Sequence, residues 1–269
     1  MKAAVVGHVE WIDFVRVERV PAPGEIVTAL EGWSEPAGGG AMAAFEFLRL
    51  GAETTFFTAV GNDELGERAE RELRASGLRL EVVTRDAPQR RGFTFLDGAG
   101  ERTITVVGEK LVPHGDDPLA WDELTSTDAA YFCGGDAKAL ELLGQSPVVL
   151  VATARELPTL KTAQFELDAL VHSGRDPSER YQPGDLQRPP RLVATTEGPA
   201  GGRFTADGTE GRWAAAPLPG PLVDVYSAGD RFAAGLAYAL AEGRAPADAL
   251  DFAAQGGALA MTRRGGGTS

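Results

Sequence analysis

Short apolar runs separated by glycines recur along the chain, and segments with apolar residues at helical spacing lie between them. Runs of this length suit buried strands of a parallel sheet, and we place such strands at residues 2–9, 54–61, 128–135, 147–153, 167–173 and 191–202. Helices are expected between and after them, at residues 41–51, 62–77, 138–143, 157–166, 228–241 and 247–263. Alternating β and α units of this kind predict an α/β fold.

Two segments depart from this pattern because their apolar and polar residues alternate. The first follows Asp13 and contains a Pro-Ala-Pro-Gly turn, and the second turns at Asp97-Gly98-Ala99-Gly100. We expect them to pair as a small sheet that covers a site at the strand ends. The full prediction is one domain over residues 1–269, a three-layer α/β/α sandwich with a mostly parallel central sheet. A small antiparallel β lid is inserted at about 14–36 and 91–107, and a surface loop is expected at 174–190.

The composition excludes several classes of function. The formal net charge of −13 and the lack of any dense Lys/Arg cluster argue against nucleic acid and anionic membranes as partners. Cys133 is the only cysteine, which excludes an internal disulfide and a cysteine-built metal site. Three scattered histidines make a histidine-based zinc site unfavourable, and no stretch resembles a signal peptide or a membrane span. A cytoplasmic protein is therefore expected.

The stretch DVYSAGDRFAAGLAYAL, residues 224–240, brings an acidic side chain to the start of a predicted helix. Small residues before Asp230 let backbone N–H groups converge on an anion, and the helix dipole adds positive potential there. A carboxylate at that place is either a first-turn acid that complements the dipole or a general base for an alcohol. The stretch alone favours the first alternative, because short patterns of this kind recur often.

The same residues resemble the C-terminal signature of the ribokinase-like (PfkB) carbohydrate kinases, commonly seen as D-T-x-G-A-G-D-x-F. The N-terminal signature of that family is resembled by AGGGAMAAFEFLRLGAETTFFTAVG, residues 37–61. Weaker similarities are VVGHVEWID, GERTIT and TTEGPAGG, which resemble a substrate-binding strand, a lid strand and a nucleotide loop. The resemblance covers essentially the whole chain, and two signatures in the right order are more specific than either alone.

The resemblance implies a kinase that transfers a phosphoryl group from ATP, with Mg²⁺, to a hydroxyl of a sugar, nucleoside or related small polyol. Asp230 would be the general base, and Asp224 would organise its loop, where relatives also place a monovalent cation. The remaining roles fall to an anion hole, an acceptor site and a nucleotide site. Ser227, Ala228 and Gly229 would form the anion hole. The acceptor site would include Asp13, Gly38 and Gly39, and the nucleotide site would include Thr196, Gly198 and Gly201.

Three positions differ from the family pattern. Met42 stands where the family has Asn, and it either lines a less polar acceptor site or packs inside its helix. The family's N-x-x-E segment, which orders the waters of Mg²⁺, is matched by Ser173 and Asp176, with Glu179 as another candidate. Arg231 is larger than the usual residue after the base, and it caps, pairs with an acid, reaches a phosphate or lies on the surface.

Three functions are compared on these residues. The kinase leads, because Asp230 is kept within its signature. A non-catalytic or regulatory ligand-binding protein on the same fold would explain the changed acceptor and metal positions. A dinucleotide-dependent oxidoreductase is disfavoured, because no G-x-G-x-x-G opens a helix after the first strand. Apolar lid residues (Trp33, Phe93, Phe95) further suggest a homodimer that forms through the lid.

Overall fold

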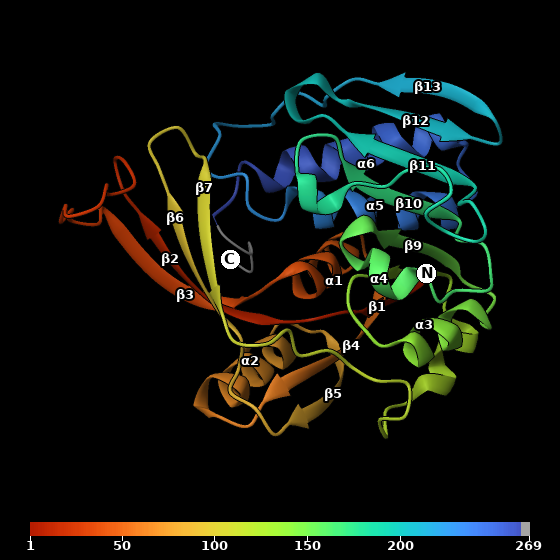
Figure 1. Ribbon diagram of the computed structural model, residues 1–269, viewed down its shortest axis with the longest axis horizontal. Helices are drawn as coiled ribbons and strands as arrows, with labels where there is room; N and C mark the ends of the chain where they lie inside the picture. The colour runs from red at the N-terminus through yellow and green to blue at the C-terminus, as the bar shows by residue number, and fades with distance from the viewer. Residues whose placement is uncertain (265–269) are drawn as a thin grey trace.

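The computed structural model describes residues 1–264, and the last five residues of the predicted domain lie outside that range. Two sheets form the frame of the molecule (Figure 1). The nine-stranded sheet has the order β13-β12-β11-β10-β9-β8-β1-β4-β5, and the four-stranded sheet has the order β3-β2-β6-β7. The strands of the large sheet are β1 (Lys2–Val6), β4 (Glu53–Gly61), β5 (Arg79–Arg85), β8 (Ala129–Phe132), β9 (Val149–Thr153), β10 (Ala169–Ser173), β11 (Leu192–Thr196), β12 (Gly202–Ala206) and β13 (Thr209–Trp213).

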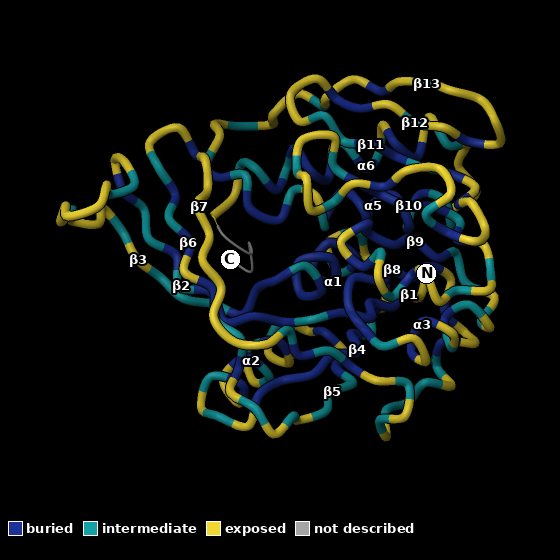
Figure 2. Tube along the Cα trace, viewed as in Figure 1, coloured by how far each residue is buried: buried dark blue, intermediate teal, exposed yellow. Residues whose placement is uncertain are grey.

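Helices cover both faces of the large sheet. They are α1 (Gly39–Arg49), α2 (Glu64–Ala75), α3 (Ala137–Gly144), α4 (Leu157–Leu160), α5 (Ala228–Ala241) and α6 (Pro246–Ala260), with short 3₁₀ turns η1 (Trp121–Ser126), η2 (Ala154–Glu156), η3 (Pro177–Glu179) and η4 (Gly198–Ala200). Along β1, Ala3 and Val5 enter the core under α1 and α5, whereas Ala4 and Val6 enter the core under α3. This alternation confirms the predicted three-layer α/β/α sandwich with a mostly parallel sheet. Figure 2 shows the central strands and α5 as buried.

The small sheet stands to one side of the sandwich (Figure 1) and consists of β2 (Glu10–Arg16), β3 (Glu31–Ala37), β6 (Arg91–Leu96) and β7 (Arg102–Val107). The two alternating segments of the sequence therefore pair with each other, as predicted. The outer pairings, β2 with β3 and β6 with β7, are antiparallel, whereas the central pairing of β2 with β6 is parallel. Only three residues separate the end of β1 from the start of β2, so the lid sheet is directly continuous with the core.

The structure differs from the sequence-based expectations in three elements. Strand β5 and the antiparallel hairpin β12–β13 were not expected, because their residues are half exposed and form no apolar run. The helix expected at 157–166 ends at Leu160. Beyond it the chain is not helical, and Phe165 packs so tightly on Gly144 that a Cβ atom there would lie 2.1 Å from the Phe165 ring. Within residues 1–264, no helix is both long and apolar enough to cross a membrane.

Candidate active site

Asp230 lies in the first turn of α5, where three elements of the core meet. Its Oδ1 atom accepts a hydrogen bond of 3.2 Å from the Tyr131 hydroxyl at the end of β8. The backbone of Gly39, at the start of α1, lies so close that an added Cβ atom would be 2.7 Å from Oδ1. The two signature glycine segments therefore converge on one carboxylate, although they are far apart in the sequence.

The surroundings of Asp230 shift its protonation equilibrium. Burial raises the pKa of Asp230 above its ordinary value, and the positive charges of Arg155, Arg102 and Lys110 partly oppose this shift. A carboxyl group with a raised pKa accepts a proton more readily near neutral pH, which suits a general base. A plain first-turn acid would complement the dipole of its own helix, whereas the hydrogen bond of Asp230 runs to another element, β8. The geometry thus favours the second alternative.

The loop before α5 is fixed at both ends. Asp224 is fully buried, and its Oδ1 atom accepts a 2.8 Å hydrogen bond from the backbone N–H of Tyr226. The hydroxyl of Tyr226 in turn accepts a 2.9 Å hydrogen bond from the N–H of Gly38. This contact joins the C-terminal signature to the N-terminal one. Asp224 therefore accepts a hydrogen bond from within the loop that leads into α5, and its role at the site stays a prediction.

The start of α5 is open on the outside. Ser227 is the N-cap residue with a left-handed φ of 65°, and its side chain makes no capping hydrogen bond to the helix. Gly229 is exposed, and a Cβ atom added to it would meet nothing within 4 Å. The first N–H groups of a helix have no partner inside the helix. Ser227, Ala228 and Gly229 therefore present backbone donors and open space together, beside the Asp230 carboxylate.

The glycines at the start of α1 allow close backbone approach. Gly38 has a φ of 89°, a conformation that side chains rarely adopt, and a Cβ atom there would lie 3.2 Å from Cγ of Glu10. Gly39 contacts Asp230 as described above. Met42, in the same helix, is fully buried in the core between the sheet and α5. This burial favours packing as the role of Met42 over contact with a ligand.

The predicted substrate residue Asp13 lies on the far face of the lid sheet. On β2, Phe14 packs edge-on against Tyr226 with ring centroids 5.1 Å apart, and Arg16 donates a 3.3 Å hydrogen bond to the carbonyl of Val223. Side chains alternate along a strand, so Asp13 points to the opposite side. Its carboxylate accepts hydrogen bonds from Ser34 and, at 2.8 Å, from Arg91. Asp13 is thus engaged within the lid sheet, and its contact with an acceptor stays a prediction.

Glu10 is the lid-strand carboxylate that shares the face of Phe14. It is buried, and it forms an ion pair of 2.7 Å with Nε of Arg90. Burial raises the pKa of Glu10. The positive charges of Arg90 and Lys110 oppose this shift, and the negative charge of Asp230 adds to it. Sequence reasoning missed this residue, although a glutamate inside the apolar run VVGHVEWI is itself a signal of a working polar group.

A further group of charges lies beyond the ends of β9 and β10. Arg155 forms ion pairs with Asp176, at 2.8 Å, and with Glu179. The Ser173 hydroxyl accepts a 3.0 Å hydrogen bond from the N–H of Asp176, so it is engaged inside its own turn. Burial raises the pKa of Glu179, the positive charge of Arg155 opposes this shift, and the negative charge of Asp230 raises the pKa further. Within residues 1–264, no group of three or more His, Cys, Asp or Glu side chains forms a preformed metal cage.

The predicted nucleotide loop follows β11. Thr196 ends the strand, and its hydroxyl donates a 3.4 Å hydrogen bond to the carbonyl of His172. Gly198 and Gly201 have φ angles of 63° and 79°, which favour glycine. A Cβ atom at Gly201 would lie 2.2 Å from the carbonyl oxygen of Trp213, so this loop is packed against the end of β13.

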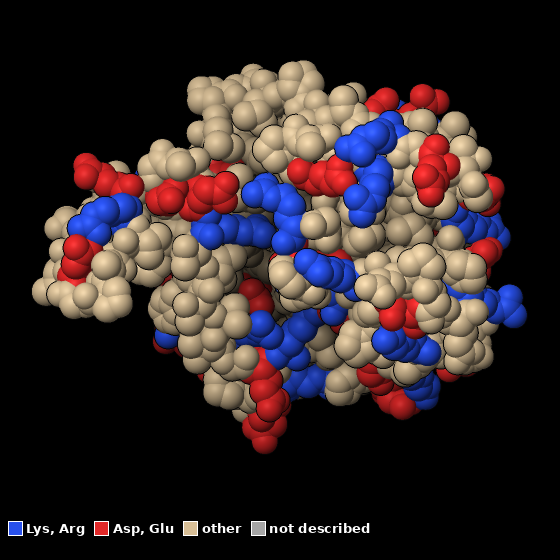
Figure 3. All heavy atoms as spheres, turned by 45° about the horizontal axis from the view of Figure 1, so that its top comes forward, with Lys and Arg blue, Asp and Glu red and all other residues tan. Residues whose placement is uncertain are grey.

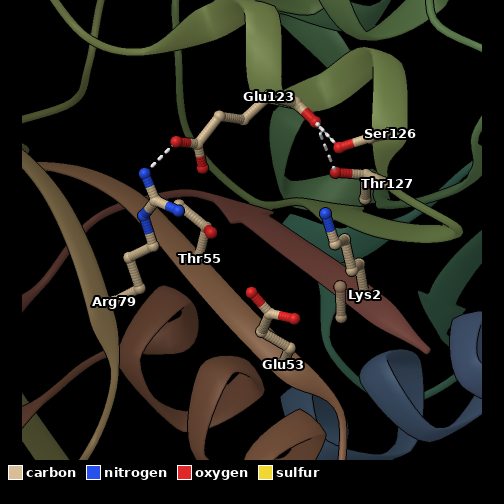
Figure 4. Close-up of a pocket in the computed structure, with 8 residues that line it drawn as sticks. Lys2, Glu53, Thr55, Arg79, Glu123, Ser126 and Thr127 are labelled. Carbon is tan, nitrogen blue, oxygen red and sulfur yellow. Dashed lines mark hydrogen bonds and ion pairs between the residues drawn. The ribbon is translucent and has the colours of Figure 1, made fainter.

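The charge of the surface is unevenly distributed. On the face seen in Figure 3, Lys and Arg side chains gather around a hollow near its middle, although the chain carries a net charge of −13. A small pocket of about 160 Å³ lies at the edge of the large sheet where strands β1 and β4 begin (Figure 4). Its charged side chains are Lys2, Glu53, Arg79 and Glu123, of which the last two form an ion pair across it. It contains none of the predicted site residues.

Comparison with known proteins identifies the family. The family model described as "pfkB family carbohydrate kinase" matches residues 1–159 and 157–269. The bifunctional ribokinase/ribose-5-phosphate isomerase A of Fructilactobacillus sanfranciscensis is 32% identical over 111 residues, which cover 40% of this chain and 20% of that protein. The ribokinase of Arabidopsis thaliana is 24% identical over 295 residues, which cover 97% of this chain and 76% of that protein.

Solved structures agree with the fold. The structure of Arabidopsis thaliana ribokinase complexed with ribose and ATP has a TM-score of 0.75, with 20% identity, and the match covers 98% of this chain and 93% of that chain. At this level of identity the likeness establishes the fold alone. The matched segments occupy only a fifth of the first curated relative, so its activity is not transferred directly.

Proposed function

Because the chain belongs to the pfkB family of carbohydrate kinases, we propose that it is an ATP-dependent phosphotransferase acting on a hydroxyl of a sugar, nucleoside or related small polyol. One observation carries the proposal. The Asp230 carboxylate lies beside the open start of α5 and against the glycine start of α1, with a pKa raised by burial. A base, an anion site and a place of close backbone approach thus adjoin one another.

The reaction follows from this arrangement. Asp230 accepts the proton of the acceptor hydroxyl as its oxygen forms the bond to the γ-phosphorus of ATP, and the bond to the β-phosphate oxygen breaks to release ADP. Backbone N–H groups of Ser227, Ala228 and Gly229 and the dipole of α5 stabilise the negative charge on the transferring phosphoryl group. The Tyr131 hydroxyl holds the carboxylate in place through Oδ1.

Two carboxylates divide the work at the acceptor site. Glu10, on the inner face of the lid, accepts hydrogen bonds from acceptor hydroxyls, while Gly38 and Gly39 let the acceptor approach the backbone. Asp13 is engaged by Arg91 on the outer face, so we assign it to the lid sheet and not to the acceptor. The lid excludes water from the site, which prevents hydrolysis of ATP.

Mg²⁺ fits the residues present as an ion that arrives with ATP. Mg²⁺ keeps several waters and needs only one or two protein carboxylates when phosphates supply other ligands, and Asp176 and Glu179, which both pair with Arg155, offer such oxygens. When bound, the ion neutralises charge on the phosphates. Thr196, Gly198 and Gly201 would lie along the nucleotide. A monovalent cation beside Asp224 stays a prediction from the resemblance, and no step depends on it.

The proposal is tested by a coupled assay of ADP release with Mg·ATP over a panel of sugars, nucleosides and polyols. We expect one acceptor class to raise turnover above the acceptor-free rate. The alternative, a non-catalytic ligand-binding protein on the same fold, is supported by the engagement of Asp176 and Glu179 with Arg155. It predicts calorimetric binding of an acceptor or nucleotide without turnover of any panel member, a result that would exclude the kinase.

A further inference from the structure

Arg231, the residue after the base, turns away from the site and into the interior. Its side chain is 4% exposed, and its Nη1 atom lies 3.4 Å from Oε2 of Glu46 in the middle of α1. Its Nε atom donates a 3.3 Å hydrogen bond to the Ser227 hydroxyl. Glu46 is 1% exposed and also accepts a 2.9 Å hydrogen bond from Nε of Arg49. A chain of contacts therefore runs from α1 through Arg231 to the N-cap of α5.

This ion pair has no evident value for stability. Removing two charges from water carries a large penalty, and well-packed apolar residues often serve a core equally well. A cation in the first turns of a helix also opposes the helix dipole. Burial lowers the pKa of Arg231, and the charge of Glu46 offsets part of that shift. Helix α6 makes room for the pair, since a Cβ atom at Gly256 would lie 2.6 Å from Oε1 of Glu46. The contact with Ser227 suits a role in positioning.

Ser227 is the residue that such an arrangement would position. Its φ of 65° is left-handed, and within residues 1–264 only Asp207 shares a positive φ among residues other than glycine. A serine in this region is strained, and it stays there only when its surroundings hold it. The hydroxyl does not cap α5 and accepts the hydrogen bond from Arg231 instead.

We propose that Arg231 is a positioning residue that holds Ser227 in the left-handed conformation, with Glu46 fixing the guanidinium group. The N–H groups at the start of α5 then stay directed at the transferring phosphoryl group. Arg231 itself does not reach the phosphate, because its side chain is almost completely buried among Glu46 and Ser227. This inference rests on the proposed phosphotransfer, in which Ser227 borders the anion hole.

Three variants separate positioning from a merely structural role. Arg231→Met keeps an unbranched side chain that can fill part of the same space and removes the donor, and Ser227→Gly adopts a positive φ without a tether. For Arg231→Met we expect kcat to fall about 10- to 100-fold while KM for the acceptor changes by less than about twofold, because the anion hole acts in the transition state. Ser227→Gly sets the reference rate with which the double variant is compared. The double variant recovers kcat to within about threefold of Ser227→Gly, because glycine no longer needs the tether.

Ser227→Ala serves as the variant for the case that Arg231→Met fails to fold. It keeps the ion pair and the Cβ atom but removes the hydroxyl, so we expect the same loss of kcat. Unchanged kcat in Ser227→Ala, or a double variant as slow as Arg231→Met, would overturn the positioning role. If the wild type transfers no phosphoryl group, the proposed function fails separately. In that case the crystal structure of Ser227→Ala still tests the positioning role of Arg231, since the inference requires residue 227 to leave the positive-φ region.

Discussion

The backbone of Gly39 at the start of α1 lies directly against the carboxylate of Asp230 at the start of α5. A Cβ atom added to Gly39 would be 2.7 Å from Oδ1 and 3.2 Å from Cγ of Asp230. This contact between residues nearly two hundred positions apart defines where the base can point, and it leads to the first prediction.

Gly39→Ala should lower kcat about 100-fold, because the methyl group pushes the carboxylate away from its hydrogen bond with Tyr131 and a displacement of about 1 Å is enough for such a loss. The melting temperature should change little, since a side chain can yield. Gly32→Ala is the matched control, because its Cβ atom would meet only the carbonyl oxygen of Phe14 at 3.7 Å. Equal kcat values for the two variants would contradict the assignment of this contact to the site.

The two lid carboxylates should respond differently to neutralisation. Glu10→Gln should raise KM for the acceptor about tenfold or more, because Glu10 faces Gly38 and the base. Asp13→Asn should leave KM within about twofold, because Asp13 lies on the opposite face with Ser34 and Arg91. Steady-state kinetics with the acceptor found in the panel measures both. A larger effect at Asp13 would mean that the lid faces the site in the opposite sense.

The carboxylates beyond β10 should differ in their effect on Mg²⁺. The charge of Asp230 acts on the pKa of Glu179, whereas the Asp176 carboxylate also accepts hydrogen bonds from the N–H and hydroxyl of Ser178. We therefore expect Glu179→Gln to raise the Mg²⁺ concentration for half-maximal turnover more than Asp176→Asn does. Chelation of Mg²⁺ should abolish turnover in both. The reverse order of the two variants would assign the organisation of the metal to Asp176.

The outer strand of the lid should mediate self-association. All six residues of β7 are exposed, among them Ile104, Val106 and Val107, and β7 is an edge strand. Of the lid residues expected from the sequence, Phe93 is exposed, whereas Trp33 stacks on Phe14 with centroids 5.0 Å apart. Sedimentation at high concentration should show a dimer that Val106→Lys weakens. A monomer at all concentrations would contradict this expectation.

The fold could be predicted because its central strands are buried on both faces and read as apolar runs between helices. Strand β5 and the hairpin β12–β13 could not be predicted. They lie at the two ends of the large sheet and are stabilised by backbone pairing with a neighbouring strand, which the local sequence does not reveal. The lid was predicted from alternation, but the parallel pairing of β2 with β6 depends on how the core brings the two strands together.

The glycines and Asp230 could be singled out from the sequence because they are local features of two signatures, and their roles stay predictions. Its long-range partners could not be read, because Tyr131 and Tyr226 reach Asp230 and Gly38 only through the folded core. The face of Asp13 could not be read from the sequence, because β1 ends at Val6 and the alternation starts anew at Glu10. A shift of one residue reverses the face of every side chain on a strand.

The raised pKa of Asp230 predicts two effects of pH. The base must be deprotonated, so kcat should decline as the pH falls through a pKa above the ordinary value for aspartate. For the same reason the charged form destabilises the folded state, and stability should decrease as the pH rises through that pKa. Asp230→Asn removes the charge and should melt at a higher temperature at neutral pH, as calorimetry would show. A lower melting temperature would indicate that the carboxylate serves the fold.

The most direct test of the whole account is single-turnover transfer of the labelled γ-phosphoryl group of ATP to the best acceptor, measured for the wild type and for Asp230→Asn. If Asp230 is the base, the variant should bind Mg·ATP and acceptor with nearly unchanged affinity while transfer slows about 100- to 10,000-fold. Transfer by Asp230→Asn at the rate of the wild type would contradict the central claim.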